Sequence, residues 1–243
     1  MTIHRKFTTI LRKLVYPSRC PGCDALLYPE EQSIGFCRSC YATVRYIGDR
    51  VCVKCGKPLE DNTRERCGDC SRRHHYFVQN RAVYLYQGAI KGAMYRFKYS
   101  NRRNYASIFA MDAWNQFGTW LNSLRVDGVV PVPMYAKKER VRGYNQAQVF
   151  AAQIAALMDV PLYDRLVVRV RATEPQKQLD DKKRKKNLEN AFKIRQSGVK
   201  LRKILLIDDI YTTGSTMDEV ARSLLAVGVQ QVYCLSICIG KGC

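Results

Sequence analysis

The chain has 243 residues, enough for one large domain or for a small domain followed by a larger one. Its formal net charge is +20, so polyanions such as nucleic acids or phosphorylated metabolites are the expected partners. Hydrophobic residues make up 47% of the sequence and support a packed core. No apolar run approaches the roughly 20 residues that a membrane-spanning helix needs, so no membrane span is expected.

Residues 1–19 are basic and partly apolar, and Arg12 and Lys13 interrupt the apolar positions. A signal peptide needs a continuous apolar region and a small-residue cleavage site, which this segment lacks. We expect a short amphipathic helix here and a cytoplasmic protein. A targeting signal or a membrane anchor is the alternative.

The chain contains 11 cysteines, and eight of them form four CxxC pairs before residue 71. In a chain without a secretion signal, such pairs are typical of metal binding and not of disulfides. Each pair can form a tight turn that directs two thiolates at one ion, and two pairs complete a closed tetrahedral zinc site. Sequential pairing predicts one site from Cys20, Cys23, Cys37 and Cys40 and a second from Cys52, Cys55, Cys67 and Cys70.

These sites predict two structural Zn²⁺ ions in a double zinc ribbon at residues 20–75, because four thiolates leave no position for a catalytic water. Cross-braced pairing, free buried cysteines and an iron–sulfur cluster are the alternatives. Zinc bound by thiolates would lower the charge of the loaded chain to about +16. His74 and His75 follow at once, and we expect them at the surface or in a linker, with spare zinc ligands as the alternative.

From about residue 76 the sequence alternates between strand-like and helix-like segments, which predicts an α/β domain with a doubly wound parallel sheet at residues 76–243. Trp114 and Trp120 lie on or near the apolar face of one expected helix and are predicted to belong to the core. Cys234 and Cys238 share one face of the last strand and are predicted to be buried. Strands are expected at 83–86, 126–132, 162–170 and 229–239, and helices at 89–99, 106–121, 146–158 and 217–227.

The most informative stretch is residues 204–216. An apolar run that begins at Ile204 suits a strand buried on both faces, and the two carboxylates of Asp208 and Asp209 end this apolar run. A hydroxyl-rich loop and a helix follow, so backbone N–H groups and the positive end of the helix dipole would converge on an anion. The loop residues are Thr212, Thr213, Gly214, Ser215 and Thr216.

Carboxylates before such a loop suit the hydroxyl groups of a sugar or a metal bound to it, so the stretch predicts a ribose-phosphate site. A Walker loop does not fit because no lysine follows Gly214, and the GxGxxG pattern is absent. The alternative is that the aspartates and threonines simply cap a helix.

A second strand–loop–helix unit contains a basic loop at residues 134–145, directly after the strand expected at 126–132. Arginine and lysine side chains in this position suit a second phosphate group, so the two loops together predict a diphosphate ligand. A solvated basic loop is the alternative. The basic residues of the loop are Lys137, Lys138, Arg140 and Arg142.

Residues 161–203 contain 14 lysine and arginine residues against 5 aspartate and glutamate residues, with a continuous basic run at 182–186. Three interpretations remain open. The stretch is a catalytic lid that closes over an anionic substrate, a nucleic-acid patch, or a solvated basic face.

Residues 204–216 resemble the phosphoribosyl-diphosphate (PRPP) signature of type I phosphoribosyltransferases. Nearly the whole chain resembles the ComF (GntX-like) family of competence and DNA-utilisation proteins. The ComF resemblance rests on the CxxC pairs, Lys98-Tyr99, Pro131-Val132-Pro133, the string from Arg142 to Ala147, the spacing of Gln178, Arg184, Asn187 and Ala191-Phe192, and residues 208–216. It implies a type I phosphoribosyltransferase-like parallel-sheet domain preceded by the zinc ribbons.

The resemblance also implies roles for individual residues. Asp208 and Asp209 would bind the ribose hydroxyls and position Mg²⁺, and Arg184 would close over the diphosphate. Loss of diphosphate from C1 passes through an oxocarbenium-like state, which needs little from a general base. The other residues implied to bind PRPP are the loop residues Thr212 to Thr216, Arg142 and Lys98.

The predicted function is that of a PRPP-binding, phosphoribosyltransferase-like protein that supports DNA uptake, natural transformation or the use of external DNA, with an acceptor that the sequence does not identify. The alternative is a non-catalytic module or adaptor that binds single-stranded DNA on the same fold. Expected partners are PRPP, single-stranded DNA, and a helicase-like or other competence protein. A zinc-ribbon transcription factor fits less well, because most of the chain forms an unrelated α/β domain.

Overall fold

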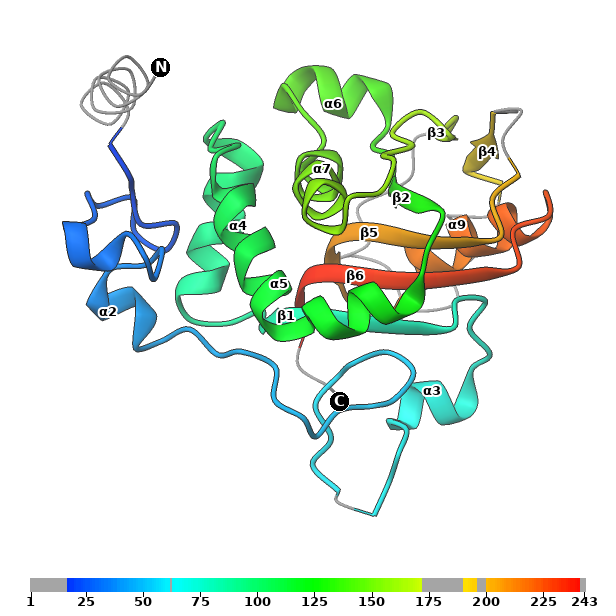
Figure 1. Ribbon diagram of the computed structural model, residues 1–243, viewed down its shortest axis with the longest axis horizontal. Coiled ribbons are helices and arrows are strands. Elements are labelled where there is room, and N and C mark those ends of the chain that lie inside the picture. Colours follow the sequence, from blue (N-terminus) through cyan, green and yellow to red (C-terminus); the bar gives the residue numbers. More distant parts are fainter. Residues whose placement is uncertain (1–16, 62, 172–189, 196–199, 241–243) are drawn as a thin grey trace. The chain divides into compact units, whose positions relative to one another are not determined.

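The computed structural model of the protein describes residues 17–61, 63–171, 190–195 and 200–240 (Figure 1). The chain divides into two compact units. The first unit consists of residues 1–45 and 87–102, and the second of residues 46–86 and 103–243. The first four CxxC cysteines therefore belong to one unit, and the last four share a unit with the sheet.

The first unit is a small assembly of short helices around the first two CxxC pairs. The carboxylate of Glu31 accepts hydrogen bonds from the backbone N–H groups of Tyr28 at 3.0 Å and Arg38 at 2.9 Å. The guanidinium of Arg96 donates to the backbone oxygen of Gly22 at 2.5 Å, which ties the long helix of this unit to the first CxxC turn. The helices are η1 (Pro29–Glu31), α2 (Arg38–Tyr41) and α4 (Ala89–Tyr99).

The second unit is built on a parallel four-stranded sheet with the strand order β1-β6-β5-β2. Residues 204–207 of β5 are fully buried, as expected for an inner strand covered on both faces. The predicted parallel sheet is thus confirmed. Its strands are β1 (Gln79–Leu85), β2 (Gly128–Pro131), β5 (Lys203–Tyr211) and β6 (Gln231–Ile239).

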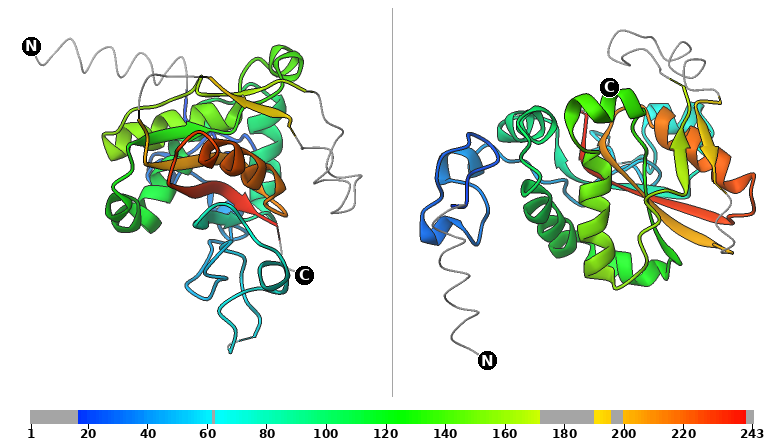
Figure 2. Two further views of the ribbon diagram at one scale, coloured as in Figure 1. Left: turned by 90° about the vertical axis from the view of Figure 1, so that its right-hand side faces the viewer. Right: turned by 90° about the horizontal axis from the view of Figure 1, so that it is seen from above.

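Helices cover both faces of this sheet. The helices α5 (Tyr105–Leu124) and α7 (Gln146–Met158) pack against each other on one face, and α9 (Ser215–Leu225) lies on the other, against β5 and β6 (Figure 2). The strongly amphipathic α9 buries residues at one helical spacing, namely Met217, Val220, Ala221 and Leu224. Two shorter helices complete the unit, α3 (Gly68–Arg72) and α6 (Ala136–Arg142).

A separate antiparallel pair, β3 (Val167–Arg169) and β4 (Phe192–Ile194), lies next to α9. The backbone N–H of Asn190, just before β4, donates to the carboxylate of Glu219 on α9 at 3.0 Å. The strand predicted at 162–170 is present but shorter, because β3 covers only Val167–Arg169. The basic run at 182–186 and most of residues 1–19 lie outside the described residues.

The strand β5 continues beyond the apolar run, because residues 208–211 extend the ladder with β6, including Ile210 opposite Cys238. Two local predictions were wrong. The basic loop at 134–145 contains α6, which ends at Gly143 with a φ of 84°. Trp114 and Trp120 are only partly buried, whereas Cys234 and Cys238 are fully buried as predicted.

No helix within the described residues is both long enough and apolar enough to cross a membrane.

Candidate functional site

The site predicted from residues 204–216 lies at the junction of β5 and α9. Asp208 and Asp209 are partly buried near the end of the strand, and α9 begins at Ser215. We call residues 212–216 the phosphate loop. The loop and the last strand residues enclose a small polar pocket whose lining includes Asp208, Gly214, Ser215 and Thr216. The structure thus brings the carboxylate of Asp208 and the phosphate loop together in one pocket, whereas Asp209 is not part of its lining.

The shape of the phosphate loop depends on Gly214. This residue has a φ of 80°, in the left-handed region that glycine adopts easily. A Cβ atom here would lie 2.4 Å from the hydroxyl oxygen of Tyr211, so the close approach of the loop to Tyr211 also requires glycine. Thr213 and Ser215 hydroxyls are 2.9 Å apart, and α9 presents the backbone N–H groups of its first turn at the same place.

The two aspartates contact their neighbours through different atoms. One oxygen of Asp208 accepts a hydrogen bond from the backbone N–H of Asp209 at 2.8 Å, which fixes the orientation of the Asp208 carboxylate. The backbone oxygen of Asp209 lies 3.8 Å from the thiol sulfur of Cys238 on β6. Carboxylates held at the end of a strand suit the hydroxyl groups of a sugar and a hard cation such as Mg²⁺.

Arg169 is a site residue that the sequence analysis missed. It ends β3, and its guanidinium stacks over the ring of Phe192 at 5.4 Å from the ring centre. Burial lowers the pKa of Arg169, and the negative charge of Asp208 opposes this shift. The charge of Asp208 therefore acts on a cation that belongs to a different sheet. The position of Arg169 in a short strand gave no signal, because this interaction depends on the tertiary fold.

The basic loop begins at the same edge of the sheet. Residues Val130 and Pro131 of β2 pair with Leu206 and Ile207 of β5, so the segment after β2 leaves beside Asp208. The side chain of Asn145 fixes the end of this segment. It donates to the backbone oxygen of Val132 at 2.9 Å and accepts from the N–H of Ala147 at 3.1 Å, which caps α7.

Arg142 contacts the helix that follows the basic loop. It is partly buried, and its guanidinium donates to the side-chain oxygen of Gln146 at 2.8 Å. Lys98 lies on α4 in the first unit, and Arg184 is outside the described residues. The expected roles of all three residues therefore remain predictions.

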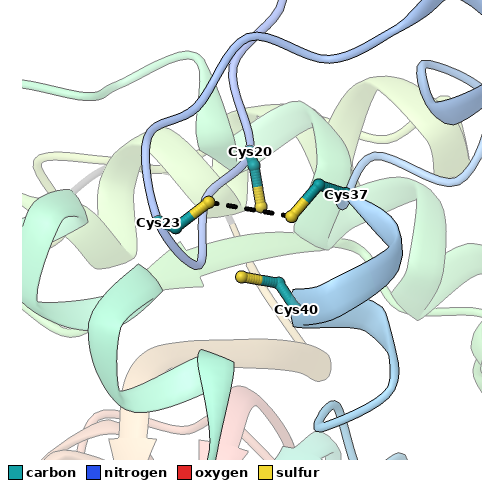
Figure 3. Close-up of side chains that lie close together, drawn as sticks. All are labelled: Cys20, Cys23, Cys37 and Cys40. Atoms are coloured by element: carbon teal, nitrogen blue, oxygen red, sulfur yellow. Dashed lines mark hydrogen bonds between the residues drawn. The ribbon is translucent and has the colours of Figure 1, made fainter.

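The CxxC cysteines form two separate clusters that fit zinc. In each cluster the four sulfur atoms lie within 4.8 Å of one another, and the grouping is sequential, not cross-braced. Figure 3 shows the four sulfur atoms of the first cluster converging on one point, with Cys23 and Cys37 at 3.7 Å. In the second cluster Cys55 and Cys67 are 3.6 Å apart. Zinc–sulfur bonds of about 2.3 Å in a tetrahedron place the sulfurs about 3.8 Å apart, so both clusters have the dimensions of a structural zinc site.

His74 and His75 behave differently from each other. His74 is exposed, as predicted, but His75 is only 4% exposed, so its predicted surface position was wrong. Its Nε2 lies 3.5 Å from the sulfur of Cys70, and its Nδ1 lies 2.6 Å from the carboxylate of Asp218 on α9. The sequence showed only two adjacent histidines, with nothing to indicate that one of them points into the fold.

Comparison with known proteins agrees with both parts of this architecture. Residues 11–71 match the Double zinc ribbon domain family, and residues 145–242 match the Phosphoribosyl transferase domain family. Competence protein ComFC of Bacillus subtilis is 30% identical over 213 residues, which cover 84% of this chain and 82% of that protein. The chain belongs to the ComF family.

Two further ComF relatives align over similar lengths. Competence protein F of Haemophilus influenzae is 29% identical over 220 residues, covering 88% of this chain and 93% of that protein. The DNA utilization protein YhgH of Escherichia coli K12 is 29% identical over 210 residues, covering 83% and 89%. The ComF chain described here therefore combines a double zinc ribbon with a phosphoribosyltransferase-like sheet domain. The match to the transferase family contains α7, β5, the phosphate loop, α9 and β6.

Proposed function

We propose that this ComF chain binds PRPP with Mg²⁺ where β5 and β2 end, and that it serves the cellular use of external DNA as a phosphoribosyltransferase-like protein. The observation that carries the proposal is the junction of β5 and α9. There, two carboxylates precede a hydroxyl-rich loop at the start of a helix, at the carboxyl edge of a parallel sheet. Ligands of such sheets bind at this edge.

Each part of the ligand has a matching group on the chain. The 5-phosphate would be bound by the phosphate loop, whose hydroxyls and N–H groups are donors. The ribose hydroxyls would donate to Asp208 and Asp209. The diphosphate would lie towards the basic loop and Arg142, with Arg184 as the expected lid residue. Mg²⁺ would neutralise charge on the diphosphate as it leaves C1.

Calorimetric titration with PRPP in the presence of Mg²⁺ tests the proposal. We expect the native chain to bind, and the double variant Asp208→Asn/Asp209→Asn to lose at least about 10-fold in affinity, since charged hydrogen-bond acceptors contribute about 1.5–3 kcal/mol each. The matched control is Asp49→Asn/Asp159→Asn, which removes two exposed carboxylates away from the pocket and should bind like the native chain.

Absence of binding by the native chain would contradict the PRPP site. Equal loss in both double variants would show that net charge, and not the pair at the end of β5, determines the affinity. Incubation of the bound complex with nucleobases, followed by detection of free diphosphate, then separates a transferase from a protein that only binds PRPP.

A second function, binding of single-stranded DNA, is favoured by the net charge of +20 and by the relatives named for competence and DNA utilization. We expect the affinity for an oligonucleotide to fall steeply with salt, because phosphate contacts release counterions. Neutralising all five residues of the 182–186 run should reduce the salt slope. An unchanged slope would remove this run from the DNA contacts. A helicase-like or other competence protein stays a predicted partner, to be sought by co-purification.

A further inference from the structure

The second cysteine cluster, Cys52, Cys55, Cys67 and Cys70, is joined to α9 through one buried side chain. The ring of His75 lies between the sulfur of Cys70, 3.5 Å from Nε2, and the carboxylate of Asp218, 2.6 Å from Nδ1. All three residues belong to the second unit. The imidazole therefore connects a metal ligand directly to the helix that begins at the phosphate loop.

Asp218 lies in the first turn of α9. Its backbone N–H donates to the oxygen of Gly214 at 2.8 Å, which is a hydrogen bond that forms the start of the helix. The other oxygen of its carboxylate accepts from the backbone N–H of Tyr76 at 2.9 Å. Residues 75 and 76 thus hold the turn whose backbone N–H groups would face the anion.

A second contact path runs beneath the phosphate loop. The ring of Phe77 stacks on His75 at 4.9 Å between ring centres and meets Tyr211 edge-on at 6.3 Å. The hydroxyl of Tyr211 lies directly under Gly214. Burial raises the pKa of Tyr211, and the negative charges of Cys55, Cys70 and Asp218 raise it further. The segment after Cys70 therefore contacts both ends of the loop.

We propose that the second zinc site is coupled to the phosphate loop, and that His75 is the positioning residue through which zinc orders the start of α9 for anion binding. Groups that hydrogen-bond to metal ligands fix the orientation of those ligands. A ligand held by zinc would in the same way fix the group that bonds to it. Because coupling between the affinities of two binding sites is reciprocal, a bound anion must then raise the affinity of this cluster for zinc. The part concerning PRPP rests on the proposed function above.

The test uses the zinc-loaded full chain and three variants: His75→Gln, Asp218→Asn and, as a matched control, His74→Gln. His74 is the exposed neighbour, and its ring meets only the edge of Tyr76 at 5.5 Å among the contacts of the described residues. Amide hydrogen exchange of a peptide covering residues 211–220 reports the order of the loop without any ligand. We expect faster exchange in His75→Gln and Asp218→Asn, and native exchange in His74→Gln.

Equilibrium competition for zinc with a chromophoric chelator, with and without PRPP and excess Mg²⁺, measures the reciprocal effect on zinc affinity. With two cysteine clusters per chain, we expect the zinc affinity of one cluster to rise several-fold when PRPP binds, and this increase to disappear in His75→Gln. PRPP affinity should fall about 10-fold in His75→Gln, the lower end of what loss of such a supporting group costs. Circular dichroism of each variant confirms that the fold is retained.

The outcomes separate the two proposals. If His75→Gln and His74→Gln exchange alike and bind zinc with the same affinities, the coupling is wrong whether or not PRPP binds. If PRPP binds to the native chain but changes the zinc affinity of neither cluster, the coupling is also wrong while the proposed function stands. If the native chain does not bind PRPP but exchange at 211–220 depends on His75, the proposed function fails and the link between the cluster and α9 is supported.

Discussion

At the scale of single residues, Gly214 decides whether the phosphate loop can form. Its φ of 80° is costly for any residue with a side chain, and a Cβ atom would collide with Tyr211. Gly228, in the turn after α9, also has a positive φ of 102°, but no atom lies within 4 Å of its Cβ position. A substitution at Gly228 therefore measures the cost of backbone strain alone, whereas one at Gly214 adds the collision with Tyr211.

We predict that Gly214→Ala lowers the free energy of unfolding by clearly more than Gly228→Ala, which should cost about 1 kcal/mol from backbone strain alone. Only Gly214→Ala should also abolish PRPP binding, because Tyr211 or the loop must move. Urea denaturation and calorimetry measure the two effects. Equal destabilisation by both substitutions would mean that the loop relaxes around the new methyl group.

At the scale of the element, Asn145 fixes both ends of the basic segment. The residue is only 6% exposed, and its side chain caps α7 through Ala147 and donates to the backbone oxygen of Val132, which directly follows β2. The sequence predicted the helix at 146–158 with both boundaries correct, since a run of alanine and large apolar residues follows an asparagine that is a strong N-cap. It did not predict α6, because seven residues with four basic side chains carry no apolar periodicity.

We predict that Asn145→Ala destabilises the fold by about 2 kcal/mol, through loss of the cap and of the partner of the Val132 carbonyl. The control is Asn104→Ala, at the N-cap of α5, where the side chain makes no capping bond within the described residues. Asn104→Ala should lower the free energy of unfolding by well under half as much as Asn145→Ala. Chemical denaturation of both variants checks the difference, and comparable losses would show that capping does not explain the role of Asn145.

At the scale of the whole molecule, the cysteine clusters belong to different compact units. The second unit surrounds its cluster with further contacts, such as the ion pair between the ammonium of Lys57, only 6% exposed, and Asp69 at 2.9 Å. A thiolate cluster of this kind stabilises the fold mainly when metal is bound, since binding energy and folding energy are shared.

We predict that the native chain holds two zinc ions, that Cys23→Ser and Cys55→Ser each retain one, and that the double variant retains none. Metal analysis of the purified proteins measures this stoichiometry. Removal of all zinc by a strong chelator should lower the melting temperature. If one single substitution emptied both sites, the two clusters would not bind zinc independently.

The sequence alone determined those features that depend on neighbouring residues in the chain. CxxC spacing predicts thiolate pairs that bind metal ions, the apolar run from Ile204 requires a buried strand, and the order of carboxylates, threonines and Gly214 specifies an anion loop. These patterns were enough to predict the α/β class, the zinc ribbons and the family.

Tertiary structure alone decided where distant residues meet. The ladder with β6 extends β5 beyond Asp208, although the two aspartates end the apolar run. The fold also places Arg169 of β3 where the charge of Asp208 acts on it. It brings His75 to both Cys70 and Asp218, which lie 5 and 143 residues away from it in the chain. No local pattern encodes such contacts, because a buried polar side chain is placed by the partner that satisfies it, and that partner is supplied by another element.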